Sequence, residues 1–467
     1  MDLLQKQRRQ SFKVIFSEAI MVIAVIFMVI VLAFIVSGYW VNPDLKIERQ
    51  GLLQVSSFPT GANVEIDGTS SWLQKTNTSK VLASGSHTIT LSKDGYDSWS
   101  KNINILEGLL YRLNYPRLFL KDREKETVFR ASDVIMASVS PSHEYLLLIN
   151  NTAEWSLVNL KNENIEPQKL ILSDSFPLAK TPDNSSQTLF AGEILDLIWD
   201  KSSSHILFKI NGHDSIEWVL LDVADPANSL NLTKSFGYNF DNMKIINDSS
   251  SLLLATQNGN LHKINLASKS ISAVLIEDVI DFDFYHDKAV FSKHNNSSNL
   301  FQVGLLELNN GKITDFKSFP AAFKVAIGRF YEDQYIAVVS ENVISLYKTE
   351  DFSELNTFEL SFSPNKIKIG HDSNFILAYA GNQLAAIEME SSDLVEWEPE
   401  VANFGWLDDY MIYEVIDGEL VVCDFDGYNL RALAKNVSSN LPVTITDNKW
   451  LYYFSDGALI REWLIPR

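Results

Sequence analysis

Hydrophobic and polar positions alternate in short bursts along most of this chain. From residue 127 to residue 467, brief apolar segments rich in Val, Ile, Leu and Phe recur between clusters of Gly, Asn, Asp and Ser. Alternation with a period of two, punctuated by turn residues, is typical of β-strands. We find no convincing amphipathic helical stretch in this region. The pattern predicts a mainly β protein.

These bursts form a repeat of roughly 35–45 residues, a period typical of repeat architectures. Each unit reads as an apolar strand, a polar turn, a very apolar strand, a tight turn and an amphipathic strand, and some add a fourth strand. The eight units are 133–162, 194–223, 242–270, 279–312, 324–351, 366–393, 401–433 and 441–466. A lone sheet of this kind cannot bury its apolar middle strands, so we expect the sheets to stack around an axis as a β-propeller. Eight blades are expected, or seven if one weak repeat is a fused hairpin.

The last repeat ends after three strands. The segment ETVFRA, residues 126–131, has the composition of a strand and precedes the first repeat. We expect it to supply the missing fourth strand, because closing the ring in this way protects sheet edges that would otherwise pair with other chains.

One continuous apolar run interrupts this pattern near the N-terminus. Residues 19–36 are all apolar, and no charge occurs from Ala19 to Pro43. About 20 helical residues cross the hydrocarbon of a bilayer, and the run is too long for the h-region of a cleaved signal peptide. Four basic residues precede it, so the positive-inside bias places residues 1–13 in the cytoplasm and the rest outside. We predict an uncleaved signal anchor at 14–40, with VSG at 36–38 as a weak cleavage site.

Residues 50–118 form a second region with short alternating strands. The candidate inward positions are Val55, Val64, Ile66, Ile89, Leu91, Ile103, Ile105, Leu110 and Leu113. Turn signals containing Gly separate them. We expect a small all-β module of five or six strands.

The motifs of this region resemble those of the PEGA domain. The elements are PTGA at 59–62, VEIDG at 64–68, SGSHTITLSKDGY at 84–96 and an aromatic residue at Trp99. The residues that carry the resemblance are Pro59, Thr60, Gly61, Ala62, Asp67, Gly68, Gly85, His87, Gly95 and Tyr96. Thr60 stands where the family has Glu, and KTNTS replaces the family's Thr-Pro. The resemblance implies a β-sandwich-like module of prokaryotic cell-surface and envelope proteins, without catalytic residues.

The repeat region resembles the propeller of the translocation protein TolB. SVSPSHEYLLLI at 138–149 and CDFDGYNLRAL at 423–433 are the matching pieces. Only these repeats match, so the resemblance implies an architecture and no ligand.

Charge excludes one class of partner. The chain has 39 basic and 59 acidic residues and a formal net charge of −20. Nucleic-acid binding needs a basic face, so we expect no nucleic-acid partner. Without Asp2, Glu18 and the four basic residues before the anchor, 35 basic and 57 acidic groups remain, a charge of −22 for the outer part.

Motifs for catalysis are missing from the sequence. There is no Gly-x-Ser-x-Gly, no His-Glu-x-x-His, no phosphate-binding Gly-rich loop and no Cys/His cluster. The carboxylate pairs Asp281/Asp283, Asp408/Asp409 and Asp424/Asp426 are interpreted as turns and solvated edges, although Asp281 and Asp283 could share a cation. Cys423 and Trp99 are expected in the core, and His87 in a turn. We predict no catalytic, cofactor or metal residue.

The sequence thus predicts a cytoplasmic tail at 1–13, the anchor at 14–40, a PEGA module at 50–118, a charged linker at 119–126 and a propeller at 127–467. The favoured function is a single-pass cell-surface scaffold that binds a protein or a cell-wall polymer through propeller loops, with the long irregular loop 173–192 as a candidate contact. Two alternatives stay open: an envelope enzyme acting on glycan or peptide in the propeller channel, and a subunit of a membrane assembly or signalling complex.

Overall fold

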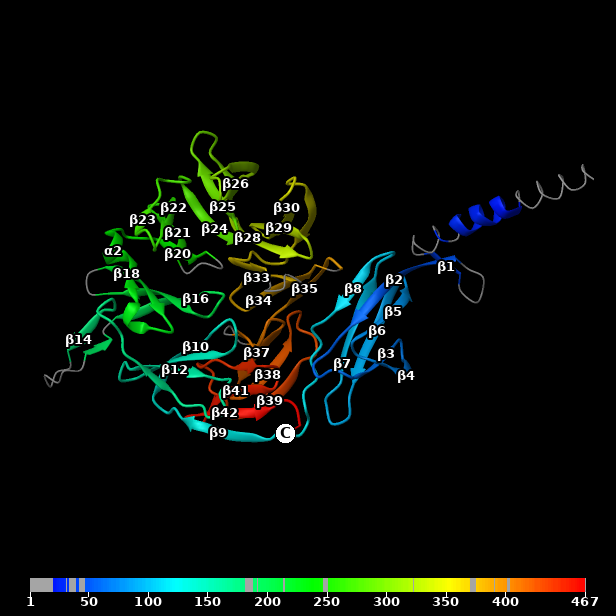
Figure 1. Cartoon of the computed structure of the whole chain (residues 1–467), viewed down its shortest axis with the longest axis horizontal. Helices are drawn as coiled ribbons and strands as arrows, with labels where there is room; N and C mark the ends of the chain where they lie inside the picture. The colour runs from blue at the N-terminus through cyan, green and yellow to red at the C-terminus, as the bar shows by residue number, and fades with distance from the viewer. Residues whose placement is uncertain are drawn as a thin grey trace, which may run out of the picture. The chain divides into compact units, whose positions relative to one another are not determined.

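The structure, a computed structural model, forms two compact units (Figure 1). Unit 1 is Met1–Lys121 and unit 2 is Asp122–Arg467. The structure describes residues 20–30, 32, 39–41, 47–180, 188–190, 192–212, 215–246, 251–321, 323–369, 375–389, 391–400 and 404–466. The division between the units falls inside the predicted linker.

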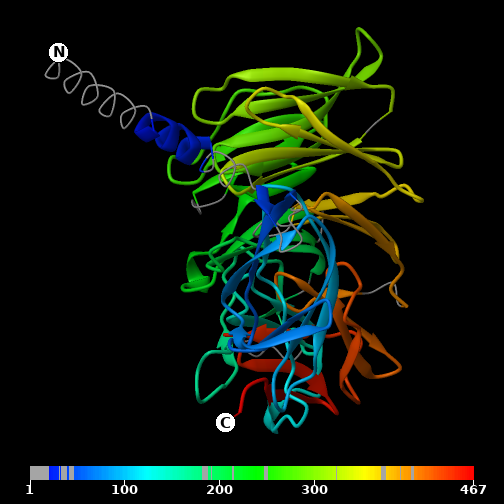
Figure 2. The same cartoon turned by 90° about the vertical axis from the view of Figure 1, so that its right-hand side faces the viewer.

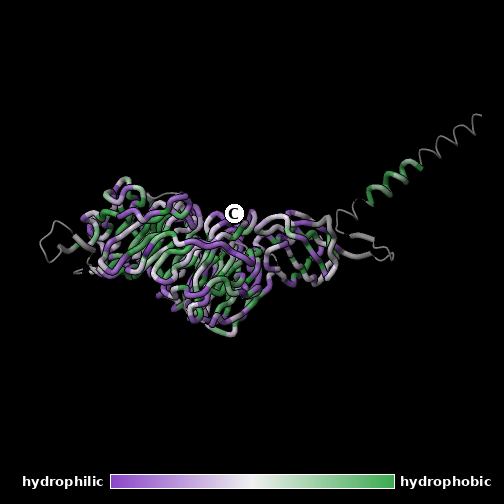
Figure 3. The backbone as a smooth tube through the Cα atoms, turned by 90° about the horizontal axis from the view of Figure 1, so that it is seen from below, coloured by the Kyte–Doolittle hydropathy of each residue, from purple (hydrophilic) through white to green (hydrophobic). Residues whose placement is uncertain are grey.

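The described part of the predicted anchor is helical at residues 20–30 and 32. Its large apolar side chains are exposed, as in Ile23 and Phe27, and Figure 3 shows this segment coloured as hydrophobic. Within the described residues, no helix is long and apolar enough to cross a membrane. Tyr39 and Trp40, the last two residues of the predicted anchor, belong to strand β1 (Tyr39–Val41), which pairs with β2. Other residues of the predicted anchor and tail lie outside the described residues.

The described residues of unit 1 form two four-stranded sheets. One has the order β1-β2-β5 with β8 also on β2, and the other has the order β4-β3-β6-β7. The strands after β1 are β2 (Ile47–Val55), β3 (Asn63–Ile66), β4 (Thr69–Lys75), β5 (Thr78–Ala83), β6 (Gly85–Ser92), β7 (Trp99–Ile105) and β8 (Leu110–Leu113). These seven strands exceed the five or six predicted, because residues 69–83 form two strands that join different sheets.

The core of unit 1 lies where the alternation predicts it. The predicted inward residues are buried, apart from the half-buried Leu110. Trp99 is fully buried, as predicted, and its ring meets the ring of Tyr115 edge-on at 6.1 Å. Leu118 and Phe119 are also buried, so the first residue of the predicted linker is packed within this unit.

Unit 2 contains eight four-stranded sheets among its described residues, numbered sheet 1 to sheet 8 along the chain. All eight are antiparallel, and each predicted repeat falls within one of them. Sheet 1 consists of β10 (Val134–Val139), β11 (Tyr145–Asn150), β12 (Trp155–Asn159) and β13 (Gln168–Leu170), and sheet 2 of β16 (Glu193–Trp199), β17 (His205–Asn211), β18 (Ile216–Asp222) and β19 (Leu230–Asn231). Sheet 3 consists of β20 (Asn242–Ile245), β21 (Leu252–Gln257), β22 (Asn260–Asn265) and β23 (Ser270–Ile271), and sheet 4 of β24 (Val279–Tyr285), β25 (Lys288–Asn295), β26 (Leu300–Glu307) and β27 (Ile313–Phe319). Sheet 5 consists of β28 (Phe323–Phe330), β29 (Asp333–Ser340), β30 (Val343–Lys348) and β31 (Glu354–Glu359). Sheet 6 consists of β32 (Lys366–Ile369), β33 (Phe375–Ala380), β34 (Gln383–Glu388) and β35 (Asp393–Trp397). Sheet 7 consists of β36 (Gly405–Trp406), β37 (Met411–Ile416), β38 (Glu419–Asp424) and β39 (Arg431–Ala434).

Sheet 8 joins the two ends of unit 2. It contains β40 (Thr444–Thr446), β41 (Trp450–Ser455), β42 (Ala458–Trp463) and, as its outer strand, β9 (Lys125–Arg130). β9 pairs antiparallel with β42. The prediction that residues 126–131 complete the last repeat is confirmed.

The sheets of unit 2 follow one another around a common centre, and each packs on the next (Figures 1 and 2). Their second strands are buried on both faces because successive side chains of a strand point to opposite sides. In β17, Ile206 and Phe208 join the core shared with sheet 1, whereas Leu207 joins the core shared with sheet 3. The same division holds in β11, β25 and β29.

Contacts also join the last sheets of this series. Phe375 of sheet 6 stacks on Trp406 and Phe425 of sheet 7, and the Ile445 N–H of sheet 8 donates to the Leu407 carbonyl at 3.2 Å. Sheets 8 and 1 share a core that includes Tyr452 and Leu146. The eight sheets therefore make contact as a closed series.

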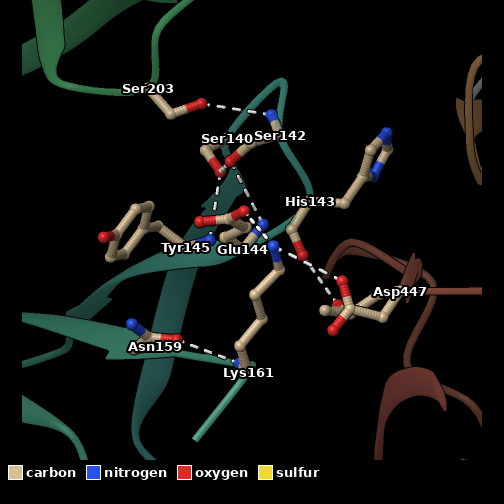
Figure 4. A network of polar contacts seen from close by, with 10 residues as sticks. Ser140, Ser142, His143, Glu144, Tyr145, Asn159, Lys161, Ser203 and Asp447 are labelled. Carbon is tan, nitrogen blue, oxygen red and sulfur yellow. Dashed lines mark hydrogen bonds and ion pairs between the residues drawn. The ribbon is translucent and has the colours of Figure 1, made fainter. Parts of the chain in front are cut away.

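A polar network reinforces the junction of the first and last sheets (Figure 4). The turn at 140–145 of sheet 1 is bonded on both sides. The Thr446 hydroxyl of sheet 8 donates a hydrogen bond to the His143 carbonyl at 2.6 Å, and the Ser142 N–H donates to the Ser203 hydroxyl of sheet 2 at 3.1 Å. Lys161 bridges Glu144 and Asp447, the latter at 3.4 Å. One turn of sheet 1 is thus held by both of its neighbours.

Candidate functional site

A cavity of about 630 Å³ lies among the first strands of the sheets of unit 2. Residues of these strands line the cavity, and the polar turns that follow β16 and β36 add Asp200, Lys201 and Asp409. Its lining comprises Pro141, Ile198, Trp199, Asp200, Lys201, Lys244, Ile245, Asp281, Asp283, Phe284, Tyr285, Lys324, Val325, Ile327, Gly328, Asn365, Lys366, Ile367, Lys368, Ile369, Tyr379 and Asp409. A pocket of this size with convergent polar groups is the natural candidate for a binding site.

Two aspartates of β24 fasten the cavity wall. Residues two apart in a strand project to the same side, so Asp281 and Asp283 both face β28. The Asp281 carboxylate accepts the Val325 N–H at 3.1 Å, and the Asp283 carboxylate accepts the Ile327 N–H at 3.1 Å. These carboxylates tie two neighbouring first strands together, so the interpretation of this pair as a solvated edge is wrong.

Lys244 engages the same carboxylates from the other side. Its ammonium lies 3.1 Å from an Asp283 oxygen and donates to the Phe282 carbonyl at 2.8 Å. Burial raises the pKa of Asp281, while the positive charges of Lys324 and Lys244 and the bond from Val325 oppose the rise. The described residues hold no cluster of three potential metal-ligating side chains, so the shared cation remains without support here.

The carboxylate of Asp200 is hydrogen-bonded within its own turn. It accepts the N–H groups of Ser204 and His205 at 2.8 and 2.9 Å and the hydroxyl of Ser202. The His205 ring, whose Nδ1 lies 3.5 Å from an Asp200 oxygen, and these hydrogen bonds hold the pKa of Asp200 far below its ordinary value against the effect of burial. The Asp200 carboxylate in turn raises the pKa of His205. Asp200 therefore shapes the rim of the cavity.

Three lysines of β28 and β32 line the cavity, and the carboxylates that act on them lie beyond ion-pair distance. Among the described residues, no ion pair within 4.0 Å is found for Lys324, Lys366 or Lys368. The Lys366 ammonium lies 5.6 Å from the Tyr379 ring centroid, and that of Lys368 lies 4.7 Å from the Trp406 ring centroid. The side chain of Lys368 is exposed to the cavity, but the protein surrounds that cavity. The resulting desolvation lowers the pKa of Lys368, and the negative charge of Asp409 opposes this shift.

The residues that carry the PEGA resemblance lie in unit 1, where several of them form or stabilise turns. His87 sits between two acceptors, with Nδ1 2.6 Å from an Asp67 oxygen and Nε2 2.8 Å from the Ala83 carbonyl. Asp67 also accepts the Thr88 N–H at 2.9 Å. The His87 and Thr88 bonds lower the pKa of Asp67. His87 belongs to strand β6, so its expected place in a turn is corrected.

The remaining motif residues shape the backbone. Gly61, Gly68, Gly85 and Gly95 have positive φ, a conformation that favours glycine. Ala62 and Tyr96 are buried, and the Thr60 carbonyl accepts from Lys93 at 2.6 Å. The Phe58–Pro59 bond is cis. These residues build the fold of unit 1.

The other acidic pairs and the cysteine lie outside the cavity lining, apart from Asp409. Asp408 accepts the N–H groups of Tyr410 and Met411, as expected of a turn. Asp424 and Asp426 are buried, which corrects their interpretation as solvated. Cys423 is buried, as predicted, and burial together with the neighbouring carboxylates raises its pKa.

The long loop 173–192 is partly regular in structure. Strands β14 (Leu178–Lys180) and β15 (Thr188–Phe190) form a hairpin, and Phe176 packs edge-on against Trp155 at 5.3 Å. The expectation of an irregular segment is therefore wrong for these residues. Positions 181–187 and 191 lie outside the described residues.

Comparison with known proteins addresses the two units separately. The model of the PEGA domain matches residues 50–117. These residues form a PEGA domain. No curated protein matches the chain.

Solved structures similar to this chain include several β-propellers. They include the C-terminal WD40 domain of Sif2 (TM-score 0.46, 11% identity, 73% of this chain and 99% of that chain). The propeller of Dos1 gives a TM-score of 0.43 at 13% identity over 73% of this chain and 95% of that chain. Hsv2 of Kluyveromyces lactis gives 0.43 at 10% identity over 65% of this chain and 98% of that chain.

Sequence reasoning missed the three cavity lysines. The signal was the alternation KIKI at 366–369, which places two lysines on one side of a first strand in an acidic chain. Their convergence with Lys324 depends on the packing of sheets 5 and 6, which no local pattern contains.

Proposed function

We propose that this chain is a membrane-tethered binding protein whose propeller holds a protein or a cell-envelope polymer outside the cytoplasm. The observation that carries the proposal is the closed contact series of eight sheets around a lysine-lined cavity. In this proposal each sheet is one blade, which gives eight blades, and β9 locks the ring. The PEGA domain acts as a spacer between membrane and propeller.

The tether rests on the apolar N-terminal run. Eighteen successive apolar residues follow a basic tail, and the helical residues within this run expose their large side chains. Exposed apolar surface of this extent is stable in a lipid environment. The tail would lie in the cytoplasm and both units outside it. Loop 173–192 and the cavity are the proposed contact regions.

Binding to envelope material tests the proposal. The purified full chain would be incubated with isolated cell envelopes of its own organism and sedimented, with envelopes treated by protease or by glycan-degrading enzymes as parallel arms. We expect saturable co-sedimentation that one of the two treatments abolishes. Co-sedimentation that neither treatment changes, or none above a bovine albumin control, would contradict the proposal.

An enzyme acting on glycan or peptide is the second candidate. The raised pKa of Asp281 favours it, because a buried carboxyl group that keeps its proton to a higher pH than usual can serve as a general acid. Against it, the same carboxylate accepts the Val325 N–H and so has a structural role. Turnover of an envelope fragment by the wild-type chain that Asp281→Asn abolishes, with unchanged binding, would favour the enzyme. A subunit role in a membrane complex stays a third proposal, tested by exchanging the apolar helix for an unrelated one.

A further inference from the structure

The cavity of unit 2 has an excess of positive charge in an otherwise acidic protein. Five lysines and four aspartates line it, whereas the whole chain has a net charge of −20. Lys244 is paired with Asp283, and Asp200 is bonded within its own turn. Lys324, Lys366 and Lys368, which have no ion pair within 4.0 Å among the described residues, all lie on β28 and β32.

Close packing of these two strands brings the lysines together. Gly328 of β28 has no side chain, and a Cβ at this position would lie 2.7 Å from a side-chain carbon of Ile369 of β32. The glycine thus makes room for β32. Lys366 and Lys368 are two residues apart in β32, and both line the cavity, as does Lys324 of β28.

The ammonium group of Lys368 loses hydration in this concave wall. The charge of Asp409 offsets part of this cost at Lys368, and Asp281 interacts with Lys324, so a bound anion would supply the further counter-charge. The depressed pKa of Lys368 is the expected consequence of such a site without its ligand. Trp199, Tyr285 and Tyr379 add aromatic surface to the same cavity.

We propose that the cavity binds an anionic group, a carboxylate or a phosphate borne on a small ring such as a sugar, through Lys324, Lys366 and Lys368. This inference rests on the proposed binding function and names the chemical class of its ligand. The lysines supply the charge, and the aromatic side chains contact the ring. The anion supplies the close ion pair that the described residues do not give these lysines.

A matched series of sugars tests the proposal with the full chain. Glucuronate carries a carboxylate, glucose 6-phosphate carries a phosphate, and glucose carries neither. Tryptophan fluorescence reports binding, because Trp199 lines the cavity and Trp406 lies beside Lys368. We expect one or both anionic sugars to bind, glucose to bind at least about tenfold more weakly, and the affinity to fall with added salt. The arm that binds more tightly identifies the acidic group.

Lysine variants locate the site. The triple variant Lys324→Gln, Lys366→Gln, Lys368→Gln should weaken anion binding by about tenfold or more, because each charged hydrogen bond contributes about that factor. Lys435→Gln is the control, since its side chain is 82% exposed and lies outside the cavity lining. If the triple variant loses its native circular dichroism spectrum, the single variant Lys366→Gln is tested in its place. Its anion affinity should also fall, by a smaller factor than in the triple variant.

Two results would overturn the inference: equal binding of all three sugars, or unchanged anion affinity in a folded lysine variant. Either result leaves envelope co-sedimentation intact, so the ligand class fails while the proposed function stands. Anion binding at the lysines without envelope binding would have the opposite meaning, because the ligand class would then stand while the proposed function fails.

Discussion

Asp67 and His87 join the turn between β3 and β4 to strand β6 of the PEGA domain. The carboxylate accepts from the Thr88 N–H and lies 2.6 Å from the ring of His87. These bonds lower the pKa of Asp67 in the folded state, so its contribution to stability is present above the ordinary pKa of aspartate and is lost as the pH falls through the folded value.

Replacement of Asp67 tests this pairing. We expect Asp67→Asn to reduce hydrogen-exchange protection of β6 at about pH 6, where the wild-type carboxylate is ionised. At a pH below the lowered pKa of Asp67 the wild type approaches the variant, because protonation of the carboxyl group removes the same interaction. Exchange is compared between the two proteins at equal pH. A protection difference that is independent of pH would contradict the role of the charge.

Lys368 provides a second test at the scale of a residue. Its lowered pKa means that its charge is lost at a lower pH than for an ordinary lysine, so anion affinity should decline as the pH rises through that value. Asp409, Lys366, Lys324 and the Trp406 ring face this ammonium group. Lys368→Arg should retain affinity at alkaline pH, since arginine stays protonated. Identical pH profiles of wild type and variant, measured by sugar titration, would contradict this account.

Single residues were predictable from the sequence where the backbone decides their role. The glycines of the PEGA motif and the buried Cys423 follow from local turn and strand patterns. Asp281 and Asp283 could not be assigned in this way, because their partners are backbone groups of the next sheet. Interactions between sheets leave no local signal in the sequence.

At the scale of elements, strand β9 decides whether the array closes. Leu459 of β42 lies opposite Phe129 of β9, is 1% exposed and belongs to the core shared by sheets 1 and 8. The repeat pattern predicted this strand because an incomplete last repeat requires a partner. It missed the division of residues 69–83 into β4 and β5, because Asn77 has positive φ and a turn of two residues separates the strands.

A core substitution measures how much the closure contributes. Leu459→Ala should lower the free energy of unfolding by about 2–5 kcal/mol, since it leaves a cavity in a packed core. Leu430→Ala removes the same atoms from a side chain that is 64% exposed and should change stability by less than about 0.5 kcal/mol. Urea unfolding followed by circular dichroism compares the two. Equal effects of both substitutions would show that the junction of sheets 8 and 1 contributes little.

At the scale of the whole molecule, charge and apolarity act in opposite directions at a membrane. The outer part carries a formal charge of −22 by sequence, so anionic headgroups repel it. Any stable membrane association must therefore come from the apolar N-terminal run. The sequence predicted two β-rich regions after this run, and the structure contains two compact units.

Extraction of membranes distinguishes an inserted segment from surface adsorption. We expect the full chain to stay in the membrane pellet after washes with high salt and with alkaline carbonate, and to be released by detergent. A chain that lacks residues 1–46 should appear in the supernatant without washing. Release of the full chain by either wash would contradict a hydrophobic tether.

The orientation of the propeller is the central claim, and protease treatment of intact cells measures it most directly. Cells would express the full chain with a C-terminal epitope tag, with a cytoplasmic protein as the control for lysis. The account predicts that external protease removes the tag while the control protein stays intact. A tag that is protected in intact cells and lost only after permeabilisation would contradict it.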